Sequence, residues 1–378
     1  MQIICKKDKL LRAMRIIETA ISTKATLPIL SNFLFELKPE TNKQPGKLNL
    51  ESTDLEIGLR YFIEAQVKSA AGLTIPAKKF GDIISELNKD DIEIVIDDES
   101  KVNIKSGKSN FLLLGTPKDE YPSLPEFDEK KSVSINKKIL YDMLRKTSFA
   151  VSTEETKYNL SGVYFVIDNK SLQVVATDGR RLAYVFNNTA LEGPNTQIRG
   201  IIPIKSINEL IKIINLEESE SSENVRFYMT ENQVTFQIGN ATLFSRLSEG
   251  KFPNYEHVIP KNNPTIIKVD AQELLSATKQ MSLITSEKGG AVRFLLKKNL
   301  LQLSATSQGI GSGEVDIDIE YDGPGLDTAF NPGYIIDVLK NIDEKEVIFE
   351  LKGPLDAAVI KPVDNKNYLC VIMPMRLT

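Results

Sequence analysis

The chain has 378 residues, too many for one ordinary hydrophobic core, and its length suggests two or three domains. Its composition, 41% hydrophobic and 26% charged, is that of a folded protein, and no run of about twenty apolar residues is available to span a membrane. The formal net charge of −4 argues mildly against a nucleic-acid ligand, unless the basic residues are concentrated on one surface.

The start of the sequence and its cysteines indicate a cellular location. The first five residues, Met1 to Cys5, are followed by charged ones, which is not the pattern of a secretory signal peptide. Cys5 and Cys370 stand at opposite ends of the sequence, and without an extracellular context we expect both to be reduced. These features together predict a cytoplasmic protein.

A plan of helix, strands and helix recurs three times along the chain. Each copy begins with a segment of helical periodicity, near Lys7, Asn136 and Asp270. A strand follows, with the sequence FLFEL at residues 33–37, VYFVI at 163–167 and VRFLL at 292–296. The next strand ends in a similar triplet: STD at 52–54, ATD at 176–178 and ATS at 305–307.

A proline-led helix completes each copy. The segments are LTIPAKKFGDIISEL at 73–87, GIIPIKSINELIKII at 200–214 and TAFNPGYIIDVLKNI at 328–342. Their prolines, Pro76, Pro203 and Pro332, lie 127 and 129 residues apart. Proline is tolerated in a first helical turn, because that N–H has no partner in the helix. Three elements in one order at one spacing predict a triplication rather than a chance recurrence.

The copies are joined by segments rich in proline. These are YPSLP at residues 121–125 and FPNY at 252–255, which predict domains at 1–126, 127–259 and 260–378. Alternating runs such as IEIVI at 92–96 and VDIDI at 315–319 predict half-exposed strands. We expect an α+β fold with helices on one face of antiparallel sheets.

Basic residues concentrate in the predicted helices and acidic ones in the strands. The first helix of copy one carries five basic residues against two acidic ones, and that of copy two carries four against one. The strands hold acidic groups such as Asp91, Glu93, Glu314 and Asp316. One basic surface would attract phosphates without regard to base sequence. The alternative is an ordinary solvated helix face, and the less basic first helix of copy three favours that alternative.

The sequence contains no catalytic or metal-binding pattern. The single histidine, His257, has no cluster of cysteines or carboxylates at metal-ligand spacing, and a Ser-His-Asp triad would depend on it alone. The GIGSG run at 309–313 precedes a strand rather than a helix, so it does not fit a dinucleotide loop. Asp178-Gly179 is typical of a tight hairpin turn, with a catalytic Asp178 as the weaker alternative. We predict a binding protein, with no cofactor, no metal and no catalytic residue.

Several segments resemble the bacterial β sliding clamps, the β subunits of DNA polymerase III. ATDGRRLA at 176–183 resembles the ATDGHRLA segment of that family, and VIMPMRL at 371–377 resembles its VVMPMRL ending. TLPIL at 26–30, STDLE at 52–56, KFPNY at 251–255 and the segment from Phe330 to Tyr334 match in family order. The resemblance covers essentially the whole chain. It implies three similar domains per chain and two chains closing into a ring around duplex DNA. Its implied partners are the replicative polymerase, the clamp loader and other proteins with a clamp-binding motif.

The family resemblance also implies functional residues. For a partner-peptide pocket between domains 2 and 3 they are Leu160, Thr177, Gly179, Arg181, Leu182, Pro253, Val258, Asn331, Tyr334, Leu355, Val371, Met373, Pro374, Met375 and Arg376. For DNA contact they are Lys24 and Tyr158, to which we add Lys78, Arg145 and Lys205 as basic residues of the predicted helices. For the dimer interface they are Phe111 and Leu113 against Leu283 and Ile284 of the second chain. Leucine, valine and methionine suit an adaptable apolar groove, whose rim we expect Arg181 and Arg376 to line. Met373 could alternatively fill core.

The sequence departs from the family pattern at several positions. Arg180 stands where the family often has histidine, and His257 where arginine is common. Gly289 replaces an aromatic residue, Asn159 replaces a second aromatic at the DNA-contacting positions, and Thr378 is an extra last residue. The departures put the peptide preference of the pocket in question rather than its location. Two alternative functions are a repeat-built enzyme or metabolite-binding protein, and a self-assembling scaffold without DNA.

Overall fold

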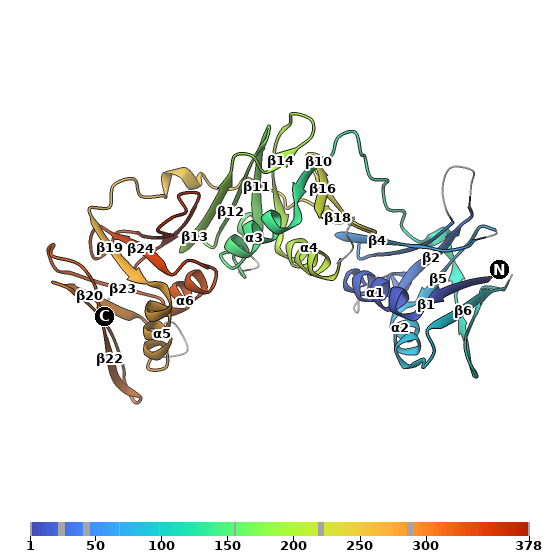
Figure 1. The fold of residues 1–378 in the computed structure, drawn as a ribbon, viewed down its shortest axis with the longest axis horizontal. Coiled ribbons are helices and arrows are strands. Elements are labelled where there is room, and N and C mark those ends of the chain that lie inside the picture. The colour runs from blue at the N-terminus through green and yellow to red at the C-terminus, as the bar shows by residue number, and fades with distance from the viewer. Residues whose placement is uncertain are drawn as a thin grey trace. The chain divides into compact units, whose positions relative to one another are not determined.

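The computed structural model describes residues 2–21, 27–40, 46–67, 69–97, 99–154, 156–217, 223–285 and 290–376 (Figure 1). The chain divides into two compact units. The first comprises Met1–Leu140, Leu191–Pro194 and Lys205–Leu247, and the second comprises Tyr141–Ala190, Asn195–Ile204 and Ser248–Thr378. Among the described residues, no helix has the length and apolar character needed to cross a membrane.

All six predicted helices are present. They are α1 (Lys7–Ile17), α2 (Ala77–Glu86), α3 (Lys137–Ser148), α4 (Ile204–Leu216), α5 (Ala271–Ser282) and α6 (Pro332–Lys340). Each buries one apolar face, as the periodicity predicts; in α1 this face holds Leu10, Met14 and Ile17. The side chains of Asp270 and Asn331 accept hydrogen bonds from the first free N–H groups of α5 and α6, which stabilises these helix starts.

One backbone hydrogen bond recurs in each copy and confirms the predicted repeat. The first residue of the first helix donates its N–H to the carbonyl of the residue just before a later strand. The three bonds are Lys7 N to Asp90 O at 2.7 Å, Lys137 N to Glu223 O at 2.8 Å and Ala271 N to Lys345 O at 2.8 Å. Because this hydrogen bond joins corresponding residues in each copy, the three copies follow the same chain path.

Two antiparallel sheets form the first unit. The smaller has the order β1 (Gln2–Lys6), β6 (Asp91–Ile96), β7 (Lys101–Ser106), β8 (Ser109–Leu114). The larger has the order β14 (Leu191–Glu192), β10 (Val133–Asn136), β16 (Asn224–Met229), β17 (Gln233–Ile238), β18 (Ala241–Arg246), β4 (Ile57–Glu64), β3 (Lys47–Thr53), β2 (Asn32–Lys38), β5 (Ala71–Pro76), β9 (Thr116–Pro117).

The second unit also contains two antiparallel sheets. One has the order β15 (Gln197–Pro203), β11 (Gly162–Asp168), β12 (Ser171–Thr177), β13 (Arg181–Asn187), β26 (Tyr368–Ile372), β25 (Ala358–Pro362), β24 (Glu346–Leu351), β19 (Thr265–Asp270). The other has the order β22 (Gly311–Asp318), β21 (Leu300–Ser307), β20 (Val292–Lys297), β23 (Leu326–Phe330). The GIGSG run lies at the start of strand β22, in agreement with the prediction that no helix follows it.

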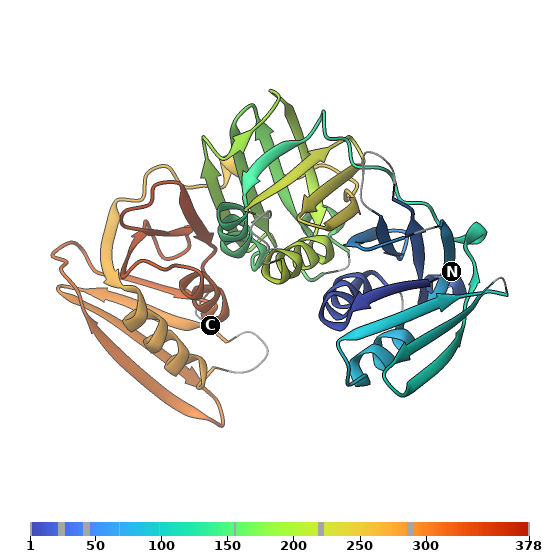
Figure 2. The same cartoon turned by 45° about the vertical axis from the view of Figure 1, so that its right-hand side comes forward.

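Helices pack side by side against the sheets in both units (Figures 1 and 2). Helix α1 packs on α2 and on strands β3 and β4, and α5 packs on α6 and on β21 and β22. Phe33 and Phe80 meet at 5.2 Å between ring centroids in the first unit, and Phe294 and Phe330 meet at 5.4 Å in the second. This is the predicted α+β architecture, with a strand–helix aromatic contact in copy one and a strand–strand aromatic contact in copy three.

Two strand pairs join residues of different copies, which the sequence did not predict. Strand β18 of copy two pairs with β4 of copy one, with Leu243 opposite Leu59. Strand β26 of copy three pairs with β13 of copy two, with Val371 opposite Leu182. In both cases the last strand of one copy covers an exposed edge of the preceding copy, which satisfies backbone groups that would otherwise attract other chains.

Candidate functional site

The hairpin between β12 and β13 forms one wall of a pocket in the second unit. Thr177 Oγ1 accepts from Gly179 N at 3.1 Å and donates to Arg181 O at 2.6 Å. Asp178 Oδ1 accepts from Arg180 N at 2.8 Å and from Arg181 N at 3.0 Å. Gly179 has φ +89°, a left-handed conformation that glycine adopts without strain. The Asp-Gly prediction of a tight turn is therefore confirmed, and the Asp178 carboxylate has a structural role.

The C-terminal segment forms the opposite wall, along the seam between β13 and β26. Met373 N donates to Arg180 O at 2.9 Å, and Met375 N donates to Ala329 O at 2.7 Å. These bonds hold the backbone after β26 against the hairpin and against β23. The Met373 side chain is 46% exposed, so it does not fill core. Met375 is half-buried.

An aromatic layer lies beneath the pocket. Tyr164 and Phe252 stack with ring centroids 4.5 Å apart, and the Tyr255 hydroxyl donates to Gln173 Oε1 at 2.7 Å. Burial, with Tyr184 nearby, raises the pKa of Tyr255 to about 12, which keeps this hydroxyl protonated. The layer belongs to a buried cluster with Val175, Leu182, Ile201 and Val371. The floor is therefore packed and rigid before any ligand arrives.

The pocket has a volume of about 160 Å³ and a mostly apolar lining. It is lined by Leu160, Thr177, Gly179, Arg180, Arg181, Leu182, Pro253, Asn254, Tyr255, Val258, Val371 and Met373. Nine of these residues are ones that the family resemblance implies. Arg180, Asn254 and Tyr255 were missed; the last two lie within the KFPNY segment, which was the available signal.

Six implied pocket residues do not line the cavity: Asn331, Tyr334, Leu355, Pro374, Met375 and Arg376. Asn331 caps helix α6 through Gly333 N at 2.9 Å, and Tyr334 lies under the Arg181 guanidinium, 4.6 Å from the ring centroid. Leu355 is 58% exposed, and Arg376 is also exposed. Gly289 and Thr378 lie outside the described residues.

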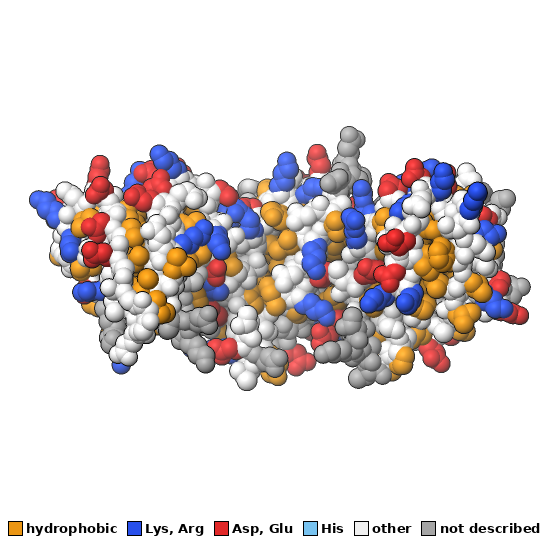
Figure 3. Space-filling view, turned by 90° about the horizontal axis from the view of Figure 1, so that it is seen from below, with side chains coloured by type: hydrophobic (Ala, Val, Ile, Leu, Met, Phe, Trp, Pro, Cys, Tyr) orange, Lys and Arg blue, Asp and Glu red, His pale blue; other side chains and the backbone are white. Residues whose placement is uncertain are grey.

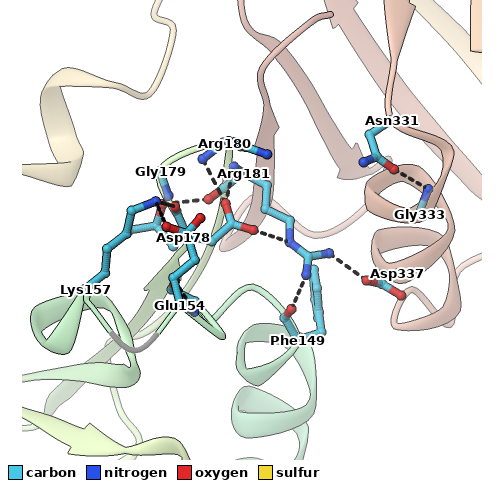
Figure 4. Close-up of polar contacts among 12 residues, drawn as sticks. Phe149, Glu154, Lys157, Asp178, Gly179, Arg180, Arg181, Asn331, Gly333 and Asp337 are labelled. Atoms are coloured by element: carbon cyan, nitrogen blue, oxygen red, sulfur yellow. Dashed lines mark hydrogen bonds and ion pairs between the residues drawn. The ribbon is translucent and has the colours of Figure 1, made fainter. Parts of the chain in front are cut away.

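The Arg181 guanidinium faces the protein rather than the rim where we expected it (Figure 4). It donates to Asp178 Oδ2 at 3.1 Å, to Asp337 Oδ2 at 2.6 Å and to Phe149 O at 2.6 Å. Its side chain is only 12% exposed. Charge-assisted bonds of this kind position their partners strongly, so Arg181 ties the pocket wall to α6 and to the end of α3.

The implied DNA-contacting residues differ in how free they are. Lys78 on α2 is exposed, and Tyr158 is 72% exposed. Arg145 pairs with Asp142 at 3.0 Å and with Asp343, while Lys205 pairs with Asp54. Lys24 lies outside the described residues. In the face drawn in Figure 3, acidic side chains lie among the lysines and arginines.

Two lysines counted in the basic helices are helix caps. Lys7 Nζ donates to Ser85 O at 2.9 Å and also to Leu87 O, at the end of α2. Lys137 Nζ donates to Glu217 O at 2.8 Å, at the end of α4. A cation there satisfies free carbonyls and opposes the negative end of the helix dipole. The basic bias of these helices therefore overstates the charge available to an external polyanion.

Two of the implied interface residues lie on a sheet edge, and the other two follow helix α5. Phe111 and Leu113 are on β8, the edge of the smaller sheet of the first unit, and Phe111 is 39% exposed. Leu283, 77% exposed, follows helix α5, and a Cβ placed on Gly313 of edge strand β22 would lie 3.4 Å from Ile284 Cγ1. The described part of the chain offers no strand partner for the outer edges of β8 and β22.

Comparison with known families identifies the chain. Residues 1–125, 134–254 and 256–376 match, in order, the N-terminal, central and C-terminal domains of the DNA polymerase III beta subunit. The chain belongs to this family. Its members are sliding clamps, processivity factors without an enzymatic activity of their own, so the prediction of a non-enzymatic clamp is confirmed.

Relatives of the family match over full length. A beta sliding clamp from Chlamydia muridarum is 31% identical over 377 residues, which is 100% of this chain and 99% of that protein. A crystal structure of the DNA polymerase III subunit beta from Pseudomonas aeruginosa has a TM-score of 0.92 at 29% identity, with 100% of both chains covered. A sliding clamp from the same organism, bound to griselimycin, has a TM-score of 0.91 at 30% identity, again with 100% of both covered.

Proposed function

We propose that the pocket around Leu182, Val371 and Met373 binds short, mostly extended peptides of DNA polymerase and of other clamp partners. Support comes from the apolar lining, from the packed aromatic floor and from Val258, which is 54% exposed at the pocket. An exposed apolar surface beside a preformed hollow is typical of an interaction site. One or two large apolar peptide side chains would occupy it, with micromolar affinity, about −8 kcal/mol.

Ring closure by two chains uses, in this proposal, the strand edges of β8 and β22. Inside the chain, β18 of copy two pairs with β4 of copy one, and β26 of copy three pairs with β13 of copy two. Strand β8 is the copy-one counterpart of β18 and β26, and β22 is the copy-three counterpart of β4 and β13. If the same pairing between counterpart strands occurs once more, β8 of one chain pairs with β22 of a second chain. Because each chain then offers both edges, two chains close without leaving one free.

The side chains near these edges fit such an interface. Leu283 and Phe111 expose apolar area that a single chain leaves in water, and Ile284 lies against the edge strand β22. Burial of both edges and of these side chains would resolve the aggregation hazard of an exposed strand.

DNA contact is assigned to Lys78, Arg145, Tyr158, Lys205 and Lys24. For the first four the support is exposure or a position on a helix together with family membership, and for Lys24, which lies outside the described residues, it is family membership alone. Binding would be weak, sensitive to salt and indifferent to base sequence, because lysines and arginines attract phosphates whatever the bases are. We further propose domain boundaries at 1–126, 127–259 and 260–378, and a cytoplasmic location, where the replication machinery works.

The single observation that carries the peptide assignment is the position of the pocket at the β13–β26 seam. Fluorescence-anisotropy titration with a ten-residue peptide containing adjacent Leu and Phe tests it. Met373→Ala with Val258→Ala should weaken binding at least tenfold, while Ile266→Ala, which removes a 56% exposed side chain from β19, should not. Equal affinity for all three proteins would refute the assignment. Retention on circular but not linear DNA tests the ring separately.

A further inference from the structure

The pocket contains one cation that no group among the described residues neutralises. Arg180 lines the cavity and is exposed, and within the described residues its guanidinium has no hydrogen bond or ion pair. The other charged lining residue, Arg181, is already bonded to Asp178, Asp337 and Phe149. Among the described lining residues there is no acidic side chain.

The backbone of Arg180 is fixed although its side chain is free. Its N–H donates to Asp178 Oδ1 at 2.8 Å, and its carbonyl accepts from Met373 N at 2.9 Å. Two hydrogen bonds, one from each wall, therefore fix the position of the Arg180 backbone, from which its side chain extends. A side chain that starts from a fixed point beside a pocket loses less conformational freedom on meeting a ligand.

From this arrangement we infer that the pocket selects peptides that carry an aspartate or glutamate close to their apolar anchor. The inference rests on the peptide-binding function proposed above and names the class of peptide. The apolar anchor fills the lining of Leu182, Val371 and Met373, and the carboxylate meets Arg180 at the mouth. An apolar wall lowers the local dielectric, which strengthens an ion pair formed beside it.

Arg180 suits this role better than an ordinary histidine would. Arginine stays charged at all physiological pH values and offers a planar donor pair that fits a carboxylate. Histidine, with a pKa of about 6.5, is mostly neutral at neutral pH. The preference for an acidic peptide should therefore be independent of pH between about 6 and 9, since only the peptide carboxylate titrates, near pH 4.

Two series of labelled ten-residue peptides test the inference by anisotropy titration. Each peptide contains adjacent Leu and Phe. In the first series a single Asp is placed at each of the other positions in turn, and in the second series a single Asn takes its place. We expect one or two positions where Asp binds about three- to fivefold more tightly than Asn, a size typical of a rim charge pair. This ratio should fall towards one in 0.5 M salt.

Variants of the full chain assign the effect to one residue. Arg180→Gln should bring the ratio to one while leaving Asn-peptide affinity unchanged, and Arg180→Lys should retain most of it. Arg180→His should regain the preference only below about pH 6.5. Lys366→Gln, which removes an exposed cation from the loop before β26, is the matched control and should retain the full ratio.

The outcomes separate this inference from the peptide-binding proposal. If the Asp and Asn peptides bind wild-type protein equally well at every position, the selectivity is refuted, but the proposal that the pocket binds peptides is not. A ratio that survives in Arg180→Gln also refutes it, because another group then recognises the carboxylate. If no peptide of either series binds, both proposals fall. Arg180 is exposed, so its variants should melt within about 2 °C of wild type.

Discussion

The Arg181 guanidinium donates to the Asp337 carboxylate at 2.6 Å and so connects strand β13 to helix α6 across 156 residues. The same group also binds Asp178 and the carbonyl of Phe149, and it lies over the ring of Tyr334. The pocket wall is therefore held by a residue that we expected to contact the partner peptide directly.

Asp337→Asn should loosen the wall without removing any lining residue. Because Asp337 is 39% exposed and Arg181 keeps two other acceptors, the loss of stability should be only about 1 kcal/mol. Peptide affinity should fall two- to threefold. Calorimetric melting and anisotropy titration measure the two effects. Asp343→Asn, which removes an exposed partner of Arg145, should leave peptide affinity unchanged.

Deleting residues 373–378 should abolish peptide binding and leave the dimer intact. The deletion removes the Met373 wall and two backbone bonds, to Arg180 and Ala329, but touches neither β8 nor β22. The truncated protein should still load on circular DNA and should lose its stimulation of polymerase processivity. Undiminished peptide affinity in the truncated protein would contradict the pocket assignment.

Leu283→Ala with Ile284→Ala should convert the dimer to monomers. Each large-to-small change in a packed interface costs about 2–5 kcal/mol, and both residues occur twice in the ring. Sedimentation velocity measures the result. Ile266→Ala provides an exposed apolar control on strand β19, which lies in a different sheet from β22. An intact dimer of the double variant at low micromolar concentration would exclude these residues from the interface.

Lys78→Gln should reduce the salt dependence of DNA binding more than Lys205→Gln. Lys78 is exposed, whereas Lys205 already pairs with Asp54 and releases fewer counterions when it meets a phosphate. Loss of one phosphate contact lowers the log–log salt slope by about 0.9. Titration of a short duplex between 20 and 200 mM salt (roughly the range in which such slopes are measured) gives both slopes. A change in base-sequence preference would contradict an encircling ring.

Neither cysteine should react with thiol reagents in the native protein. Both are free and buried, and burial raises the pKa of Cys5 and of Cys370 to about 12. Because folding favours the protonated thiols, their contribution to stability is complete below pH 9.0 and is lost as the pH rises towards 12. An Ellman assay at pH 8 should detect both thiols only in guanidinium chloride. Rapid native labelling would show that one site opens.

The sequence alone determined the parts of the molecule that depend on local periodicity. The six helices, the Asp178-Gly179 turn and the threefold plan follow from residue spacing and from preferences that act over a few residues. The family resemblance located nine of the pocket residues, and seven of them lie within the short contiguous segments 176–183, 251–255 and 371–377.

The tertiary structure alone decided how these parts meet. The pairing of β4 with β18 and of β13 with β26, the engagement of Arg181 by Asp337 and the pairing of Lys205 with Asp54 join residues more than a hundred positions apart. The local sequence around a charged residue or an edge strand is the same whether or not a residue far along the chain pairs with it. For this reason the sequence could not distinguish Arg180 from its neighbour Arg181. The guanidinium of Arg180 is unpaired among the described residues at the pocket, whereas that of Arg181 is bonded to Asp178, Asp337 and Phe149.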